Sequence, residues 1–121
     1  MHTVLIALLL LQIKHFIGDF VLQSARQSRF KSGYGHRAGL EHAGIHAVLT
    51  LPCLLGVGVA LTSAVIAAAA EFVVHYHEDW LKERIIYRAG LTSGDQGYWL
   101  AFGADQLVHQ LTYLAMIAVL L

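Results

Sequence analysis

Residues 3–23 read TVLIALLLLQIKHFIGDFVLQ, an apolar run that carries His15 and Asp19 near its end. The run is long enough for a helix that crosses a bilayer, which needs about 20 residues. His15 and Asp19 are four residues apart, so a helix presents both side chains on one face, about one turn apart. Ionisable groups inside a membrane helix are costly and usually face the interior of a bundle. The stretch therefore predicts a transmembrane helix with a polar stripe.

The composition of the whole chain also favours lipid as its solvent. Of the 121 residues, 57% are hydrophobic and 13% are charged, which is outside the usual balance of a soluble domain. Eight Lys and Arg balance eight Asp and Glu, so the chain lacks the basic excess that nucleic-acid binding requires. The single Cys53 excludes an internal disulfide and a C-x-x-C metal motif. We expect one domain over residues 1–121, with membrane lipid and not nucleic acid as its partner.

Three further segments are similar to the first in length and apolar character. We predict an all-α fold, an integral membrane four-helix bundle of antiparallel transmembrane helices. The predicted helices cover residues 3–25, 40–61, 62–84 and 98–121. The first is expected to be retained, since no Lys or Arg precedes it and no small-residue cleavage site follows it. A bundle this small is also a candidate for pairing with a second copy of itself.

The basic residues predict the orientation of the bundle. Between the first two helices the chain has no acidic residue and carries Arg26, Arg29, Lys31 and Arg37. Between the last two it carries Lys82, Arg84 and Arg88. The positive-inside rule assigns both segments to the cytoplasm. We therefore expect a multi-pass membrane protein with both termini outside.

The polar pair of the first helix has a counterpart on each of the other three. With the same i, i+4 spacing the chain contains His42 and His46, His75 and Asp79, and Asp105 and His109. Because the helices alternate in direction, all four pairs fall at the cytoplasmic end of the bundle. A single pair is most simply an interhelical hydrogen-bond partner. Four pairs at one depth favour a metal centre, because structural contacts do not require this energetic cost on every helix.

Five imidazoles and three carboxylates suit zinc, with manganese or iron as alternatives, and we expect two divalent ions. The predicted ligands are the members of the four pairs, His15, Asp19, His42, His46, His75, Asp79, Asp105 and His109. With three or four protein ligands per ion, coordination positions stay open, as they do in catalytic sites. The three aspartates are the candidate catalytic residues, and one of them would bridge the ions.

Further polar residues are expected around these ligands. Gln23, Glu71 and Gln106 lie on the same stripes and are candidates for orienting the ligands. Glu71 is one turn deeper than His75, so it is either a further ligand or a protonated carboxylic acid. His77 lies off the stripe of His75 and is expected at the membrane interface.

Three basic residues of the first loop are candidates for binding an anion. Lys31, Arg26 and Arg29 are predicted above the site, where they would hold a phosphate group. The positive-inside signal explains the same charges without any ligand. Both interpretations of these residues stay open.

The segments HFIGDFVLQ at His15, LEHAGIH at Leu40, HYHEDWLK at His75 and ADQLVH at Ala104 together resemble a family of small bacterial and phage membrane proteins. That family is catalogued as domain of unknown function 3307. The resemblance covers nearly the whole chain and implies a multi-pass protein of the bacterial inner membrane, without an established activity. The extra His77 and Glu78 of HYHED depart from the family pattern, which leaves the ligands of this helix open.

The paired H-x-x-x-D motifs also look like those of the zinc-dependent phospholipase C and P1 nuclease group and of predicted membrane-bound metal-dependent hydrolases, by analogy only. Our leading hypothesis is a metal-dependent hydrolase that attacks a phosphoester or lipid headgroup at the cytoplasmic leaflet with a metal-activated water. The substrate would be a phospholipid or a lipid phosphate. The alternative is a metal- or proton-binding membrane scaffold or transport accessory protein without catalysis. A haem held between facing histidines is a third hypothesis, against which the aspartates argue.

Overall fold

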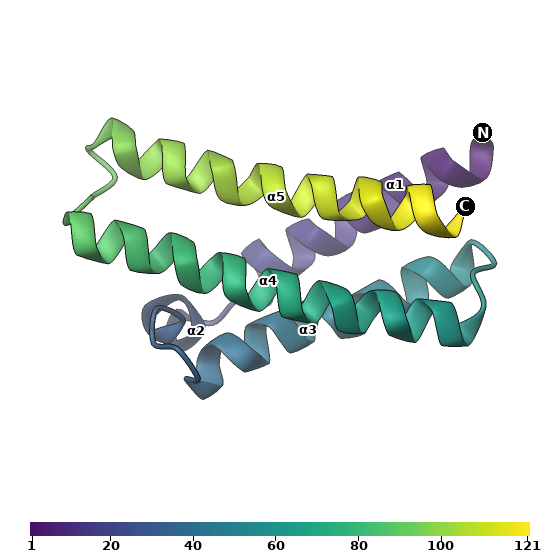
Figure 1. Cartoon of the computed structure of the whole chain (residues 1–121), viewed down its shortest axis with the longest axis horizontal. Helices are drawn as coiled ribbons and strands as arrows, with labels where there is room; N and C mark the ends of the chain where they lie inside the picture. The colour runs from purple at the N-terminus through teal and green to yellow at the C-terminus, as the bar shows by residue number, and fades with distance from the viewer.

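The computed structural model describes all 121 residues and contains five α-helices, one π-helical turn and no strand. The predicted all-α fold class is therefore confirmed. In chain order the elements are α1 (His2–Phe16), η1 (Ile17–Val21), α2 (Ala25–Phe30), α3 (Arg37–Gly56), α4 (Leu61–Ala89) and α5 (Gln96–Leu120) (Figure 1).

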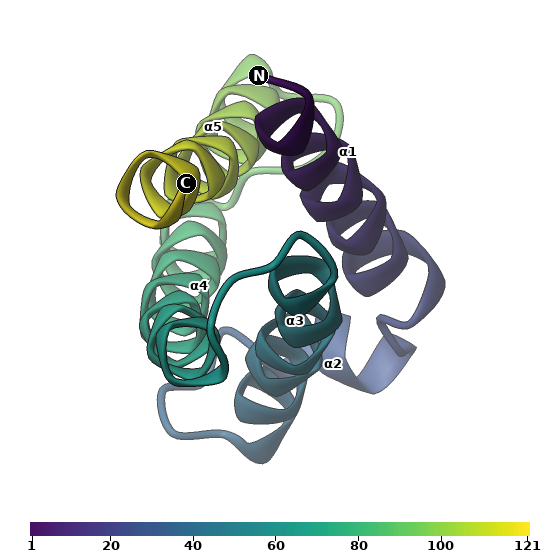
Figure 2. The same ribbon diagram turned by 90° about the vertical axis from the view of Figure 1, so that its right-hand side faces the viewer.

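The four long helices run antiparallel and close into a ring. α3 packs against α1 and α4, and α5 packs against α4 and α1, so each long helix has two long neighbours (Figure 2). The short α2 packs beside α3, at the end of the bundle where the α4–α5 loop also lies (Figure 1). Both termini and the turn between α3 and α4 lie at the opposite end. This ring encloses an interior to which all four long helices contribute side chains.

The first predicted helix, over residues 3–25, ends earlier than expected. The Leu22 N–H donates to the Ile17 carbonyl oxygen (2.8 Å), an i→i+5 bond that makes the last turn π-helical. The Ser24 hydroxyl then accepts from the Gln27 N–H (3.2 Å), while the Gln27 side chain accepts from the Ser24 N–H (2.9 Å). This reciprocal capping box starts the separate helix α2. The predicted loop thus contains a helix of its own.

α3 begins at Arg37, before the predicted residue 40, and the His36 side chain caps it by accepting from the Ala38 N–H (3.1 Å). Glycines account for the later end of α4 and the earlier end of α3. α4 continues beyond the predicted residue 84 to Ala89, and it ends where Gly90 takes the left-handed φ of 61° that L side chains disfavour. α3 ends at Gly56, before the predicted residue 61, and Gly58 has a φ of 89° in the turn to α4. The start of the segment predicted to connect the last two helices is therefore part of α4.

One side chain closes the loop between α4 and α5. Asp95 accepts from the backbone N–H (2.7 Å) and the hydroxyl (2.9 Å) of Thr92. Both bonds favour the charged carboxylate and hold the pKa of Asp95 below its usual value. The Trp99 indole N–H also donates to the Ser93 carbonyl oxygen (2.8 Å). These contacts fix the start of α5, two residues earlier than predicted, beside the end of α4.

The interior is apolar at one end and polar in the middle. Near the termini an apolar cluster joins α1, α3 and α5 and consists of Ala7, Leu11, Cys53, Tyr113, Met116 and Ile117. Over the whole chain, buried polar and charged side chains are as numerous as buried hydrophobic ones, and large hydrophobic side chains face outward on every long helix. This distribution is the reverse of that in a soluble domain, where charged groups are rarely buried.

Two helical segments, His2–Val21 and Arg37–Gly56, are long and apolar enough to cross a membrane, judged by length and composition alone. The sequence analysis expected four such spans. α4 and α5 are long but do not meet the same hydropathy criterion. Both carry several of the polar and ionisable residues described next, which lowers their mean hydropathy.

Candidate metal centre

The four polar pairs meet in the interior of the ring. All of their side chains are buried except that of Asp19, which is 13% exposed. The set comes from α1, η1, α3, α4 and α5 and contains His15, Asp19, His42, His46, His75, Asp79, Asp105 and His109. Neighbouring imidazole rings are in contact, with ring centroids 3.9 Å apart for His46 and His75 and 4.3 Å apart for His75 and His109. The four pairs, which were expected at one depth of the bundle, thus form one cluster.

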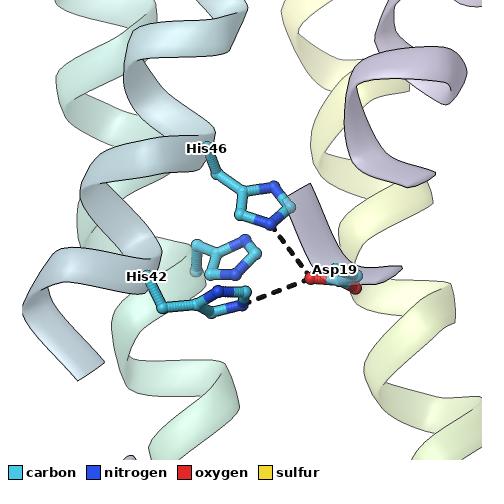
Figure 3. Close-up of side chains that lie close together, drawn as sticks. Asp19, His42 and His46 are labelled. Atoms are coloured by element: carbon cyan, nitrogen blue, oxygen red, sulfur yellow. Dashed lines mark ion pairs between the residues drawn. The ribbon is translucent and has the colours of Figure 1, made fainter. Parts of the chain in front are cut away.

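The π-helical turn η1 aims Asp19 into this cluster. Its Oδ1 atom is 2.9 Å from His46 Nε2 and 3.2 Å from His42 Nε2 (Figure 3). Such a close approach requires Gly18, because a Cβ at that position would overlap the His46 ring. π-helical turns occur frequently at functional sites. Sequence spacing alone gave no sign of this turn.

One group of potential ligands consists of Asp19, His42, His46 and His75, whose candidate ligand atoms all lie within 4.8 Å of one another. Both ring nitrogens of each of these three histidines lack a hydrogen-bond partner, although carboxylate oxygens are nearby. Unsatisfied buried polar atoms are rare in proteins and require an explanation. A metal ion among the four side chains satisfies nitrogens that the protein leaves without partners. The residues therefore fit a metal.

A second group lies next to the first and consists of Glu78, Asp79, Asp105 and His109. His75, Asp79 and His109 form a third group that connects the two. The His109 Nε2 atom is 3.0 Å from Glu78 Oε2 and 3.4 Å from Asp105 Oδ1. Glu78 is not among the ligands predicted from the sequence, although its presence in HYHED left the ligands of this helix open. Its signal was the i, i+3 spacing from His75, which places it near the same helix face.

His15 reaches the cluster but lies outside all three groups. Its Nδ1 atom is 2.9 Å from the Tyr113 hydroxyl, and its Nε2 atom is 2.9 Å from Gln106 Oε1 and 3.2 Å from Asp19 Oδ2. Gln106 Nε2 also donates to Asp19 Oδ2 (3.4 Å). His15 and Gln106 therefore contact one oxygen of Asp19 and leave the other facing His42 and His46.

Glu71 lies deeper in the bundle and belongs to none of the ligand groups. It forms a buried ion pair with Lys14 and accepts a hydrogen bond from the Thr50 hydroxyl. The Lys14 ammonium also lies 4.6 Å from the centroid of the Tyr113 ring. Neither alternative offered for Glu71 from the sequence, ligand or protonated acid, describes this charged pair. Lys14 was missed because it appears as one charge within a long apolar run.

Two lysines approach the cluster from the end of the bundle that carries α2 and the α4–α5 loop. Lys31 Nζ is 3.2 Å from Asp79 Oδ1, and Lys82 Nζ is 3.4 Å from both Asp79 Oδ1 and Asp105 Oδ2. The other oxygen of each carboxylate faces an imidazole, since Asp79 Oδ2 is 3.2 Å from His42 and Asp105 Oδ1 is 3.4 Å from His109. Each aspartate thus separates a lysine from the histidines.

The remaining predicted residues divide between this region and the surface. The Gln23 side chain accepts from Lys31 Nζ (3.1 Å). Arg26 pairs with Glu41 at the surface, and Arg29 is exposed with its guanidinium 5.5 Å from the Phe30 ring. Neither arginine lines the cavity at the lysines. The structure therefore brings Lys31 to the cluster, and not Arg26 or Arg29.

His77 points away from the cluster, as its position off the stripe of His75 indicates. Its Nδ1 atom is 2.8 Å from the Val73 carbonyl oxygen and its Nε2 atom is 3.0 Å from the Tyr34 hydroxyl. Both ring nitrogens therefore have protein partners at an exposed position. His75, two residues earlier, has none.

The family described as "Protein of unknown function (DUF3307)" matches residues 4–121. The chain belongs to this family. No curated protein and no solved structure matches the chain. Membership of DUF3307 confirms the resemblance seen in the four motifs, but its description carries no activity. What this DUF3307 chain does has to be argued from the cluster itself.

The charge balance of the DUF3307 cluster also fits a cation. Five carboxylates, Asp19, Glu78, Asp79, Glu83 and Asp105, lie with only two ammonium groups, Lys31 and Lys82, which leaves an excess of negative charge when the imidazoles are neutral. Burying uncompensated charge is strongly unfavourable. A divalent ion compensates this excess, and the nitrogen and oxygen donors suit zinc, manganese or iron.

Proposed function

We propose that this chain is a membrane-embedded metalloenzyme that hydrolyses a phosphoester or lipid headgroup at the cytoplasmic leaflet. One observation carries the proposal. The unpartnered imidazoles of His42, His46 and His75 converge with Asp19 directly beside a cavity that Asp19 itself lines. A metal held there would be reachable from the surface, as a catalytic metal has to be.

The outward-facing side chains support the membrane part of the proposal. Leu9 in α1, Val48 in α3, Ile66 in α4 and Leu107 in α5 are each more than half exposed. Apolar surface on all four long helices exceeds what a soluble monomer usually exposes. At 1.5 Å per residue, α4 and α5 are about 44 and 38 Å long, sufficient to cross a hydrocarbon core of about 30 Å. We therefore keep the proposal of four spans, with the polar face of α4 and α5 turned inward.

The orientation follows from the basic segments. α2 and the α4–α5 loop lie at the same end of the bundle, and the basic residues of the chain are concentrated there. The positive-inside rule assigns this end to the cytoplasm. The cavity is lined by Ser28 of α2 and by Lys82 of α4, so it belongs to the same end. Both termini are then outside.

Two ions are proposed, each with its own ligands. The first group, Asp19, His42, His46 and His75, is rich in nitrogen and suits zinc. The second, Glu78, Asp79, Asp105 and His109, is rich in oxygen and suits zinc, manganese or iron. Asp79 Oδ2 is 3.4 Å from His75 Nε2 and 3.2 Å from His42 Nε2, between the two groups. Asp79 is therefore the aspartate best placed to bridge the ions.

The proposed reaction is hydrolysis of a phosphate ester. A metal-bound water has a lowered pKa and supplies hydroxide at neutral pH. In hydrolysis the water oxygen forms a bond to phosphorus, the bond to the ester oxygen breaks, and the alcohol leaves with a proton. Asp19 and Asp105 are the carboxylates of the cluster that also line the cavity, so they are positioned to accept and return that proton.

The proposal is tested with the purified full chain in detergent. Bound metals are quantified and hydrolysis of phosphoesters and phospholipids is measured beside an Asp19→Ala, His109→Ala double variant, which removes one ligand from each group. We expect bound metal and turnover in the wild type and loss of both in the double variant. Turnover that survives in the double variant would contradict the proposal.

A metal-holding scaffold without catalysis is the second candidate. The observation that favours it is that both lysines of the cavity are already paired with carboxylates. Tightly bound metal without any turnover would support it. Haem binding has less support, because ring centroids of neighbouring histidines lie as little as 3.9 Å apart, and a macrocycle does not fit between them.

A further inference from the structure

The cavity beside the metal centre has a volume of about 160 Å³. Its polar side is formed by residues of the cluster and by two lysines that are almost fully buried, Lys31 at 5% and Lys82 at 8% exposure. A buried lysine is costly unless something pairs with its charge. Two of them at one cavity therefore indicate a place where negative charge is gathered.

The partners of these lysines lie only at moderate distance. Lys31 Nζ has Gln23 Oε1 at 3.1 Å, Asp79 Oδ1 at 3.2 Å and Glu83 Oε1 at 4.0 Å. Lys82 Nζ has Glu83 Oε1 at 3.3 Å and oxygens of Asp79 and Asp105 at 3.4 Å. Charge-assisted bonds between ammonium and carboxylate are typically 2.7–2.9 Å long. Both ammonium groups are therefore held loosely enough to turn a donor towards a ligand in the cavity.

The charge around the lysines depends on the metal centre. Asp79 and Asp105 each direct one oxygen to a lysine and the other to an imidazole of the metal groups. Without metal, Asp79, Asp105 and Glu83 together outweigh the two lysines and repel an anion. Divalent ions bound to the carboxylate oxygens that face the imidazoles would compensate this negative charge. The two ammonium groups would then attract an anion. Anion binding and metal binding should therefore be coupled.

Four of the residues that line the cavity are apolar. They are Phe20 of η1, Ile86 of α4, and Tyr98 and Phe102 of α5. Lys82 Nζ lies 5.8 Å from the Phe102 ring, so charged and apolar side chains adjoin. A cavity lined by both kinds of side chain fits a phosphate group that carries an apolar substituent.

We propose that Lys31 and Lys82 form the phosphate subsite of the enzyme, that the substrate is a phosphate monoester on an apolar chain, and that the subsite accepts phosphate only when metal is bound. This inference rests on the proposed function and assigns its substrate class. It also replaces two of the residues expected from the sequence, Arg26 and Arg29, by Lys82.

Binding of radiolabelled inorganic phosphate and of butyl phosphate to the zinc-loaded full chain in detergent tests the subsite. Lys82→Met and Lys31→Met should each weaken phosphate binding about tenfold or more, the loss of one charge-assisted hydrogen bond. Lys82→Arg should recover most of the affinity. Arg29→Gln removes an equal charge outside the cavity and should bind as the wild type does. Butyl phosphate should bind several-fold more tightly than inorganic phosphate.

The outcomes separate this inference from the proposed function. Lysine-dependent phosphate binding without any hydrolysis supports the subsite and contradicts the enzyme. Hydrolysis by the wild type, with unchanged phosphate affinity in metal-loaded Lys82→Met and Lys31→Met, overturns the subsite and leaves the enzyme. Equal phosphate binding with and without zinc overturns the coupling. Butyl phosphate that binds no better than inorganic phosphate overturns the apolar substituent and indicates free phosphate as the ligand. Zinc content, measured for every variant, confirms that each retains a folded metal centre.

Discussion

Gly18 lies against the imidazole ring of His46, so closely that a Cβ at position 18 would overlap the ring. The contact is made by the π-helical turn that also carries Asp19 to 2.9 Å from His46 Nε2. Gly18 thus determines where the ring of His46 lies, and Asp19 is the carboxylate that this ring faces. A metal centre built from the first ligand group depends on this one close approach.

Replacing Gly18 should therefore disturb metal binding without removing a ligand. In Gly18→Ala the new methyl group displaces the His46 ring, and we expect metal affinity to fall about tenfold or more, as it does when residues that orient ligands are lost. Competition with a chromophoric chelator measures the affinity. Gly103→Ala is the matched control, because a Cβ there has no atom within 4 Å and Ala favours the helix. Equal affinities of the two variants would show that the contact does not position His46.

The buried pair of Lys14 and Glu71 should contribute to stability and not to metal binding. Lys14→Met leaves the Glu71 carboxylate without its partner, which should lower the free energy of unfolding by about 3–5 kcal/mol. Adding Glu71→Leu removes the uncompensated charge and should restore most of the stability. Thermal unfolding in detergent measures both. A Lys14→Met protein as stable as the wild type would show that the pair contributes nothing.

The sequence predicted which polar residues cluster in the interior, because helical spacing alone puts residues four apart on one face. Because successive helices run in opposite directions, the pairs were also predicted to lie at one depth in the bundle. Two features depended on information that spacing does not contain. The π-helical turn arises from one shifted backbone hydrogen bond, between Leu22 and Ile17. The pairing of Lys14 with Glu71 joins residues far apart in the chain and is set by the rotation of two helices.

The roles of individual residues were predicted less well than their location. His15 shares the spacing of the other ligands, but both of its ring nitrogens contact protein side chains, Tyr113 and Gln106. Glu78 lacked the i, i+4 spacing and was not among the predicted ligands, although it lies 3.0 Å from His109. Whether a ring nitrogen has a hydrogen-bond partner depends on how the helices pack against one another in the bundle. Spacing along one helix does not reveal it.

The proposed topology predicts which cysteines a membrane-impermeant maleimide labels in intact cells. Starting from Cys53→Ala, we expect Thr62→Cys, in the first turn of α4 beside the α3–α4 turn, to be labelled, because the proposed orientation places this end of the bundle outside. Ser93→Cys in the α4–α5 loop should be labelled only after the membrane is permeabilised. Both positions are exposed or nearly so, so access to reagent is not limited by the fold. The reverse pattern would invert the orientation, and labelling of both in intact cells would contradict a spanning bundle.

Metal binding should weaken as the pH falls. Imidazoles and carboxylates bind metal only when deprotonated, so protons compete with the ion for the ligands of both groups. Between about pH 7.5 and about pH 5.5, where histidine ordinarily takes up a proton, we expect dialysis to remove the metal and neutral pH to restore binding. Retention of all the metal at the lower pH would mean that histidines are not ligands.

The central claim is a metal centre built on histidines that lack hydrogen-bond partners. Its most direct test is the metal content of the wild type and of two variants, whose substituted histidines are two residues apart in the sequence. His75→Gln removes a ligand that belongs to two of the three groups, whereas His77→Gln alters an exposed histidine bonded to Tyr34. We predict about two divalent ions per chain in the wild type and in His77→Gln, and loss of metal in His75→Gln. A folded wild type that binds no divalent metal, or a His75→Gln variant that binds as much as the wild type, would contradict the account.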